Sequence, residues 1–477
     1  MKNPDTKITV QTKIQYPATN TLDRETRWVA IELPAEDNFG ELELWAFQGI
    51  IVSIGYMDDE KQRIIGSGVM VAPGICLTAT HVMDVMRNKN ALVYSFPCKN
   101  SMRIWRPQDF QAEQRVTAEI MPFQRATPRY IDVGILSISP FSIFNDNSDY
   151  VFVPLEVSIP KIGERLWAAG YREIENDGVP TLSFFYTSGI VTEQYLEGRG
   201  TFINGPCVEV AMETLGGMSG GPVFNNRGRV IGIISSSLDG PKGPTYVSMI
   251  WTTLMSTVMA PWPENLWPAN VAGMQVPIDN GIKLSGSGRL DSAGAYKVKF
   301  PEQDSESMLS IFITAGIDVP IENYDMEDFA YENFEEYLTG EGLKYLSTVD
   351  KDIFDRALIQ TEYTEIIKLF SCCDATLLEG IEDLNIQSVK VLDDGNIGVD
   401  ALYNLRIVFM RLKIPRQQFE AHKNHICSLE GMHDQVIDED YVYYDHYTRP
   451  FFRVNFSYSI ESRKCKEVRF QALTLKI

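Results

Sequence analysis

The feature that most constrains the fold is the texture of residues 50–250, where short apolar runs alternate with turn residues. Runs such as RIIGSGVMVAPGICLTATHV, IDVGILSIS and RVIGIISSS are bounded by Gly, Pro, Asn and Asp. Pro73-Gly74, inside the first run, predicts a hairpin turn. Strands that are short and frequently interrupted are typical of a sandwich or barrel. The sequence therefore predicts an all-β region here.

The chain divides into stretches of different composition. Its 477 residues accommodate two to four domains at roughly 100–200 residues each, and we expect two. Residues 1–39 are predicted to be a leader that packs onto the β domain of residues 40–258. Residues 259–296, rich in Pro and Trp and then in small polar residues, are predicted to be a linker. Residues 297–477 are predicted to form a second domain.

The second domain is predicted to be α+β. The apolar spacing of residues 351–371 favours a helix, and several later runs resemble strands: LRIVFMRLKI, YVYY, FFRVNFSYSI and VRFQALTLKI. Acidic residues crowd residues 322–341, and no basic residue occurs between Lys299 and Lys344. We interpret this run as a solvated helix face. The alternative is an electrostatic docking surface for a basic partner.

Composition limits the classes of function. Apolar residues make up 44% and charged residues 22%, as in soluble globular proteins. The formal net charge of -21 argues against binding to nucleic acid or anionic membranes, and no run of about 18 apolar residues predicts a membrane span. The first twenty residues lack the apolar stretch of a secretory signal. Seven scattered cysteines without CxxC spacing favour reduced thiols, so we expect a cytoplasmic protein.

The stretch GGMSGGPVF, residues 216–224, is the most informative for chemistry. Glycines on both sides of Ser219 allow a tight turn with positive φ, which other residues resist. Such a turn can direct two backbone N–H groups, here those of Gly217 and Ser219, at one point beside the hydroxyl. That arrangement is an oxyanion hole. The alternative interpretation is a turn built of small residues with no catalytic role.

A serine nucleophile needs a base, and the base needs an orienting acid. Of five histidines, His81 alone lies in the β-rich region, where it closes the strand CLTAT. Asp132 leads into the alternating strand IDVGILSIS, where a carboxylate is costly unless it has a partner. Asp84 is nearer to His81 in sequence. In a helical turn, however, a residue three positions after His81 would be badly placed to bond the far ring nitrogen. We therefore prefer Asp132.

The motifs THV, DVGIL and GMSGGP, in this chain order, resemble the signature motifs of trypsin-like (chymotrypsin-fold) serine peptidases. The resemblance covers roughly residues 40–258. It implies an N-terminal all-β double barrel, followed here by the C-terminal α+β domain. It also implies that Ser219 is the nucleophile, His81 the general base and then acid, and Asp132 the orienting acid.

Further stretches resemble the substrate-binding parts of that family. RVIGIISSS resembles its substrate strand, which implies that Ser235, Ser236 and Ser237 contact the peptide. GPTYVSMI, residues 243–250, resembles the strand pair that closes its specificity pocket. Glu213 lies six residues before Ser219, where an acid at the base of the pocket would favour Lys or Arg at P1. The alternative is a surface glutamate.

Two departures from the family pattern are informative. Val82 stands where secreted members carry a disulfide-forming cysteine, and Met218 stands where members activated by cleavage carry an aspartate. Activation by a salt bridge to a new N-terminus therefore cannot operate. The sequence is more similar to the disulfide-free bacterial members.

Three other interpretations fit parts of the sequence. GMSGG also fits the nucleophile elbow of α/β-hydrolase esterases, but that elbow leads into a helix, whereas here a turn and another strand are expected. A protease-like scaffold or binding module without activity is the main alternative, and the presence of all three triad residues argues against it. Four residues near the C-terminus could in principle bind zinc: His422, His425, Cys427 and His433. Their spacing matches no common zinc site, so no metal is expected.

Together these patterns predict a cytoplasmic serine endopeptidase that cleaves protein or peptide substrates and needs no cofactor. Since a cytosolic protease must be restrained, we expect the C-terminal domain, or a regulatory protein that it binds, to control access or recruit substrate. The architecture resembles regulated bacterial proteases of stress or antiviral defence. The competing expectation is constitutive processing or quality control.

Overall fold

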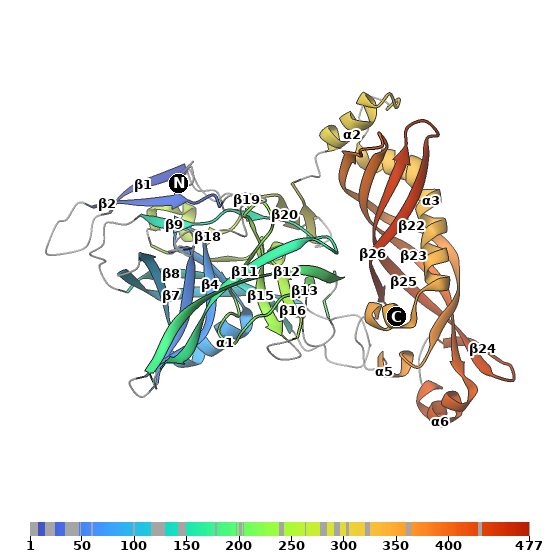
Figure 1. Ribbon diagram of the computed structural model, residues 1–477, viewed down its shortest axis with the longest axis horizontal. Helices are drawn as coiled ribbons and strands as arrows, with labels where there is room; N and C mark the ends of the chain where they lie inside the picture. The colour runs from blue at the N-terminus through green and yellow to red at the C-terminus, as the bar shows by residue number, and fades with distance from the viewer. Residues whose placement is uncertain are drawn as a thin grey trace. The chain divides into compact units, whose positions relative to one another are not determined.

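The chain forms two compact units, each described by itself (Figure 1). The protease unit comprises Met1–Gln194 and Ile203–Pro301, and the C-terminal unit comprises Tyr195–Phe202 and Glu302–Ile477. The computed structural model describes residues 8–14, 24–33, 47, 49–58, 61–98, 101–115, 129–141, 149–176, 179–196, 198–199, 203, 205–237, 243–262, 264–276, 284–290, 296–301, 305–319, 325–358, 364–427 and 432–476.

Six antiparallel strands close the first barrel of the protease unit, in the order β3-β4-β5-β8-β7-β6. Pro73 and Gly74 form the predicted turn between β4 and β5, where Gly74 has a φ of 70°. One helix, α1 (Thr80–Lys89), follows β5 and ends at Asn90 in the left-handed conformation. The strands are β3 (Ile51–Asp58), β4 (Lys61–Ala72), β5 (Ile75–Thr78), β6 (Leu92–Cys98), β7 (Ser101–Arg115) and β8 (Arg129–Pro140).

A second ring of six strands follows. The order β14-β11-β12-β13-β16-β15 closes on itself because β14 also pairs with β15, so the unit holds two six-stranded barrels, as the sequence predicted. The short strand β10 (Leu155–Glu156) extends this sheet from β15. The ring consists of β11 (Arg165–Asn176), β12 (Val179–Tyr195), β13 (Cys207–Ala211), β14 (Pro222–Phe224), β15 (Val230–Ser237) and β16 (Thr245–Met249).

The described part of the predicted leader packs on the first barrel. Strand β2 (Arg24–Ala30) lies between β1 (Ile8–Ile14) and β9 (Tyr150–Phe152) in a three-stranded sheet. Trp28, which is fully buried, stacks on Tyr150 at a centroid distance of 4.8 Å. Residues 1–7, 15–23 and 34–39 of that leader lie outside the described residues.

Much of the stretch predicted as a linker contributes to the protease unit. Pro261 lies against Gly74, and the N–H of Trp262 donates to Ser139 Oγ of β8 at 3.0 Å. The division of the chain at residues 259–296 stays a prediction, although contacts group the chain with the protease unit as far as Pro301. The elements are the 3-10 helices η3 (Ile250–Thr253), η4 (Glu264–Leu266) and η5 (Pro268–Asn270), and the strands β17 (Thr257–Met259), β18 (Val271–Gly273), β19 (Leu284–Ser285), β20 (Ser287–Leu290) and β21 (Tyr296–Lys299).

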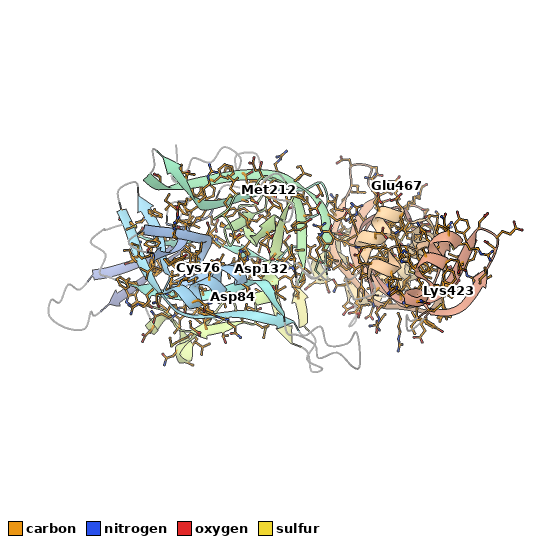
Figure 2. The ribbon with its side chains drawn as sticks, turned by 90° about the horizontal axis from the view of Figure 1, so that it is seen from below. Cys76, Asp84, Asp132, Met212, Lys423 and Glu467 are labelled. Atoms are coloured by element: carbon orange, nitrogen blue, oxygen red, sulfur yellow. The ribbon has the colours of Figure 1, made fainter. Side chains whose placement is uncertain are left out.

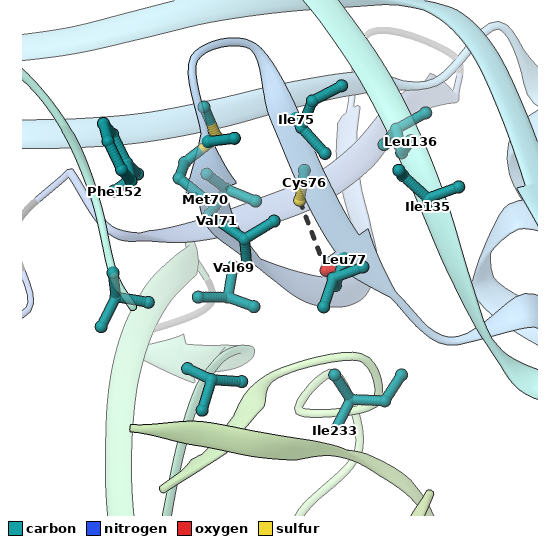
Figure 3. Packing of buried hydrophobic residues seen from close by; sticks show 14 of the residues in the cluster. Val69, Met70, Val71, Ile75, Cys76, Leu77, Ile135, Leu136, Phe152 and Ile233 are labelled. Atoms are coloured by element: carbon teal, nitrogen blue, oxygen red, sulfur yellow. Dashed lines mark hydrogen bonds between the residues drawn. The ribbon is translucent and has the colours of Figure 1, made fainter. Parts of the chain in front are cut away.

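The core of the first barrel fixes the strand that leads to His81. All four residues of β5 are buried, and the thiol of Cys76 donates to the carbonyl oxygen of Leu77 at 3.4 Å among aliphatic neighbours (Figure 3). Burial raises the pKa of the Cys76 thiol to about 12, so this thiol stays protonated. Close packing of this kind holds the backbone of β5 in one position.

In the C-terminal unit, an antiparallel sheet in the order β22-β23-β25-β24 carries β26 as a further partner of β25. The long helix α3 runs along this sheet (Figure 1). The unit is α+β, as predicted. Its elements are α2 (Ser305–Thr314), α3 (Met326–Thr348), α4 (Lys351–Ala357), α5 (Thr364–Ile367), α6 (Arg416–Ile426), β22 (Ser371–Val391), β23 (Ile397–Pro415), β24 (Met432–Ile437), β25 (Tyr441–Ser459) and β26 (Lys464–Lys476).

One sequence prediction for this unit needs correction. The helix expected over residues 351–371 is replaced by two short helices, α4 and α5; Leu358 instead bridges to Leu475 of β26, and Ser371 begins β22. The strand-like runs YVYY and FFRVNFSYS both lie in one long strand, β25. The apolar spacing of a short helix and the start of a buried strand look alike in sequence, and tertiary pairing decides between them.

The acidic run is a helix face, as interpreted. Asp325 caps α3, its side chain accepting from the N–H groups of Glu327 and Asp328 at 2.9 and 3.0 Å. Apolar residues of the helix, including Phe334 and Leu338, are buried in the core, whereas its acids in the described range are exposed or half-buried. Glu322 lies outside the described residues.

Within the described part of the chain, no helix is long and apolar enough to span a membrane. Six cysteines, at positions whose side chains the structure describes, are free thiols: Cys76, Cys207, Cys372, Cys373, Cys427 and Cys465.

Candidate active site

His81 sits at the junction of β5 and α1. The helix begins without a side-chain cap, because Ala79 stands at the cap position. Instead, the hydroxyl of Thr80 donates to the carbonyl oxygen of Ile131 at 2.6 Å. Ile131 immediately precedes Asp132 on β8, so this bond ties the two segments that carry His81 and Asp132. Nothing in the sequence indicates this bond, because Thr80 and Ile131 are 51 residues apart.

The imidazole of His81 and the carboxylate of Asp132 are paired. Nδ1 of His81 lies 3.0 Å from both carboxylate oxygens, and the backbone N–H of His81 donates to Oδ1 at 3.1 Å. The hydroxyl of Ser235 donates to Oδ2. The Asp132 side chain is 17% exposed, and the His81 side chain is 50% exposed. The carboxylate is thus held by three groups while the far edge of the imidazole remains accessible.

The environment raises the pKa of His81 above its ordinary value of 6.5. Burial opposes protonation of the ring, but the hydrogen bond to Asp132 and the negative charge of that carboxylate outweigh it, with a smaller contribution from Asp84. Asp84 lies on α1 and forms an ion pair with Arg87 at 3.5 Å. Figure 2 labels both Asp132 and Asp84 on the protease unit.

Ser219 lies in a tight loop between β13 and β14. Gly217 and Gly220 have φ values of 93° and 83°, which only glycine adopts readily. A side chain at Gly220 would also collide with Thr78 Oγ1 at 2.2 Å, because the loop packs on the end of β5, close to His81. The hydroxyl of Ser219 donates to the carbonyl oxygen of Ser235 at 3.4 Å.

Ser235 therefore contacts two of the predicted catalytic residues. Its hydroxyl binds Asp132, and its carbonyl oxygen accepts from Ser219. It is 2% exposed and lies at an irregularity of β15, where the pairing with β16 shifts between Ile234 and Ser236. In the described part of the chain, Ser219 and His81 share no direct hydrogen bond.

The loop also orients backbone N–H groups. The amides of Met218, Gly220 and Gly221 donate to Leu215, Ile234 and Met218 at 3.0, 2.7 and 2.9 Å. Among the described residues, the amides of Gly217 and Ser219 have no acceptor. These are the two amides predicted to form the oxyanion hole.

The other predicted substrate-binding residues lie nearby. Ser236 and Ser237 continue β15, paired with Tyr246 and Thr245 of β16. The side chain of Ser237 lies outside the described residues. Glu213 follows β13 and is exposed, and within the described part of the chain it forms no ion pair. The neighbouring Thr214 is 5% exposed and its hydroxyl lies 2.8 Å from that of Thr245.

The histidine and cysteine cluster near the C-terminus is not assembled as a metal site. His422, His425 and Cys427 lie at α6, while His433 lies on β24. Among the described residues, no group of three or more His, Cys, Asp or Glu side chains could hold a metal ion.

Two six-stranded barrels thus bring His81, Asp132 and the loop of Ser219 close together. Comparison with known proteins identifies the type of domain: a family model of the trypsin-like peptidase domain matches residues 66–233. The chain therefore contains a trypsin-like serine peptidase domain, as its motifs indicated.

Similar proteins are glutamyl endopeptidases. One from Staphylococcus epidermidis is 28% identical over 192 residues, which cover 39% of this chain and 60% of that protein. Another, from Staphylococcus aureus strain MW2, is 25% identical over 170 residues, covering 35% and 46%. The chain thus spans less than two thirds of the length of these relatives. The crystal structure of the Rv3671c protease in its inactive form covers 46% of this chain and 93% of its own, at 15% identity and a TM-score of 0.30.

Proposed function

We propose that this chain is a serine endopeptidase in which Ser219 is the nucleophile, His81 the general base and acid, and Asp132 the orienting acid. The observation that carries the proposal is the pairing of His81 Nδ1 with both oxygens of Asp132 at 3.0 Å, which leaves the opposite ring nitrogen to face solvent and substrate. In this role His81 removes the proton of Ser219 as the hydroxyl attacks the scissile carbonyl.

The amides of Gly217 and Ser219 complete the proposed chemistry. The attack places negative charge on the carbonyl oxygen, and these two N–H groups, which have no acceptor among the described residues, stabilise it. His81 then donates its proton to the leaving amine, and water hydrolyses the acyl-enzyme with His81 again as the base. The direct hydrogen bond between Ser219 and His81 forms when substrate displaces the hydroxyl from Ser235.

The test is labelling by a fluorophosphonate probe, which reacts with activated serines. Wild type should label rapidly, and Ser219→Ala and His81→Ala should not. His422→Ala, an exposed histidine on α6, and Ser310→Ala, an exposed serine on α2, are the matched controls and should label like wild type. Absence of wild-type labelling, with no partner that restores it, would favour the scaffold interpretation instead.

For specificity, we propose that Glu213 favours Lys or Arg at P1. Its exposed carboxylate forms no ion pair in the described part of the chain, so it can attract a cationic side chain. The glutamyl endopeptidases to which the chain is similar carry the opposite preference in their name. A panel of peptides differing only at P1 separates the two. Preference for Lys and Arg, reduced in Glu213→Gln, supports the role of Glu213, whereas preference for Glu contradicts it.

We further propose that the enzyme acts in the cytoplasm and that its C-terminal unit restrains cleavage or recruits the protein substrate, in a bacterial stress or antiviral response. The free thiols support a reducing compartment. Removal of residues 302–477 distinguishes the roles. Restraint predicts faster cleavage of small peptides after removal. Recruitment predicts unchanged cleavage of small peptides and loss of activity on the protein substrate.

A further inference from the structure

Ser67 lies on β4 of the first barrel, where it meets the oxyanion loop, which we define as residues 215–221. It is fully buried. Its backbone N–H donates to the carbonyl oxygen of Ser219 at 2.8 Å, and its hydroxyl donates to the carbonyl oxygen of Gly217 at 2.8 Å. The same hydroxyl accepts from the N–H of Tyr171 on β11 at 2.7 Å. Ser67 thus joins the loop to both barrels.

The hydroxyl of Ser67 donates its single hydrogen to the carbonyl oxygen of Gly217 and accepts the N–H of Tyr171 with one lone pair. The carbonyl oxygen of Tyr171 is a second acceptor at 3.3 Å, but the shorter distance assigns the hydrogen to Gly217. The carbonyl oxygens on either side of Met218 are therefore both held by one residue. Because the N–H of Ser67 holds Ser219 by itself, only the contact to Gly217 depends on the side chain.

The contact to Gly217 bears on the oxyanion hole. The amide of Gly217 can turn away by rotation about the bonds of this residue, and glycine resists such rotation less than any other residue. A hydrogen bond to the Gly217 carbonyl oxygen restrains the rotation of the peptide group that follows Gly217. The second restraint is steric, because a Cβ on Gly217 would lie 2.9 Å from the carbonyl oxygen of Tyr171, so the loop lies directly against β11.

Resting on the proposed function, we propose that Ser67 is a positioning residue that holds the Gly217 amide in the orientation needed to bind the oxyanion. It acts through Gly217 and does not touch the substrate. Without the hydroxyl, two buried backbone groups lose a partner, and the loop gains alternatives to the orientation described here.

The first test is independent of activity. Hydrogen exchange of the full-length protein, followed by mass spectrometry, reports on the amides of Met218, Gly220 and Gly221, which are hydrogen-bonded within or beside the loop. In Ser67→Ala, peptides covering residues 212–224 should exchange roughly 10-fold faster than in wild type. Ser137→Ala is the matched control: this buried β8 serine donates to the carbonyl oxygen of Asp109 at 3.4 Å, and its loss should not change exchange in the loop.

The second test separates positioning from a merely structural role. With the fluorophosphonate probe, the maximal rate of inactivation in Ser67→Ala should fall about 10- to 100-fold, while the concentration giving half-maximal rate stays within about twofold, because the transition state alone needs the oxyanion amide. Ser137→Ala should match wild type in both constants. If Ser67→Ala does not fold, Ser67→Cys, which keeps a weak donor and acceptor, should give an intermediate change in both tests.

The outcomes distinguish the two proposals. Faster exchange together with slower inactivation at unchanged probe binding supports the role of Ser67. Unchanged exchange, or faster exchange with an unchanged inactivation rate, overturns it. If the probe never labels the wild type, alone or with a partner, the proposed peptidase function is overturned instead. In that case, faster exchange of the loop in Ser67→Ala still supports the proposal that Ser67 holds Gly217 in place.

Discussion

The two units are both rich in β-structure, but they differ in strand length. Three strands that lead into loops of the candidate site in the protease unit are short, since β5 has four residues, β14 three and β13 five, whereas Asp132 lies on the longer β8, of 12 residues. In the C-terminal unit, β22, β23 and β25 have 21, 19 and 19 residues. Short strands end often, and each end places a loop where its polar groups can converge. Long strands spread their polar groups along a sheet.

The treatment of buried charge differs in the same way. Asp400 and Arg453 of the C-terminal unit are each 3% exposed, and their bidentate contact includes a 2.8 Å bond from Nη2 to Oδ2. Both side chains of this pair are closed to solvent. Asp132 in the protease unit is also held on several sides, but its partner His81 remains half-exposed. A charged pair thus becomes a candidate for chemistry when one of its members stays exposed to solvent.

The largest expected effect is loss of catalysis when a residue of the candidate triad is replaced. Ser219→Ala and His81→Ala should each lower kcat/KM by roughly 10⁴- to 10⁶-fold, because the triad acts as a unit. The thermal midpoint should change little in Ser219→Ala, whereas His81→Ala should also lower it, because the Asp132 carboxylate loses its imidazole partner. Steady-state kinetics with the best peptide from a P1 panel measures the effect. Retention of a tenth of wild-type activity in either variant would contradict the assignment.

Replacement of a member of the buried Asp400–Arg453 pair should lower stability rather than activity. Asp400→Ala leaves the Arg453 guanidinium buried without its carboxylate, and we expect the C-terminal unit to lose about 3–5 kcal/mol of unfolding free energy. Hydrogen exchange in β23 and β25 measures this loss. The double variant Asp400→Leu, Arg453→Met is the control, because two apolar residues leave no buried charge; it should be markedly more stable than Asp400→Ala. If Asp400→Ala and the double variant are equally stable, the unpaired Arg453 charge does not destabilise the sheet.

The pH dependence of activity follows from the raised pKa of His81. Only the neutral imidazole can accept the serine proton, so kcat/KM should fall as pH decreases through a pKa above 6.5. The linkage to stability has the opposite sign: the imidazolium–Asp132 pair stabilises the fold fully below pH 6.5, and that contribution is lost as pH rises through the folded-state pKa.

Proton NMR of the histidine ring in Ser219→Ala measures that pKa directly, with His81→Gln identifying the resonance. Asp132→Asn removes the hydrogen-bonded carboxylate, and the pKa of His81 should fall because burial then dominates. A pKa in Asp132→Asn equal to that of its parent would mean that the pair seen here does not form in solution.

Much of the protease unit could be predicted because its signals are local. The turn at Pro73-Gly74, the strands β15 and β16 and the glycines around Ser219 are each encoded within a few residues. The residues brought to the candidate site, His81, Asp132 and Ser219, were each found through such a local pattern, and the catalytic roles given to them stay predictions.

The supporting hydrogen bonds could not be predicted, because their partners are distant in sequence. Thr80 bonds to Ile131, 51 residues away, and Ser67 bonds to Gly217, 150 residues away. The same reason explains the error at residues 351–371, where the pairing of Leu358 with Leu475 ends the helical arrangement. Local propensity is a weak guide wherever such tertiary contacts decide the conformation.

The smallest expected effect tests whether the C-terminal unit controls catalysis at all. Asp325→Ala removes the cap that accepts two N–H bonds at the start of α3, and should cost the unit about 1 kcal/mol. Asp350→Ala, which removes a single bond at the cap of α4, is the matched control and should cost less. If the unit restrains the protease through α3, loosening α3 should raise peptide cleavage in Asp325→Ala more than in Asp350→Ala. Denaturation measures the expected drop in stability. If both variants lose that stability but cleave peptides as fast as wild type, α3 has a packing role only, and any control of the protease would have to act through the sheet.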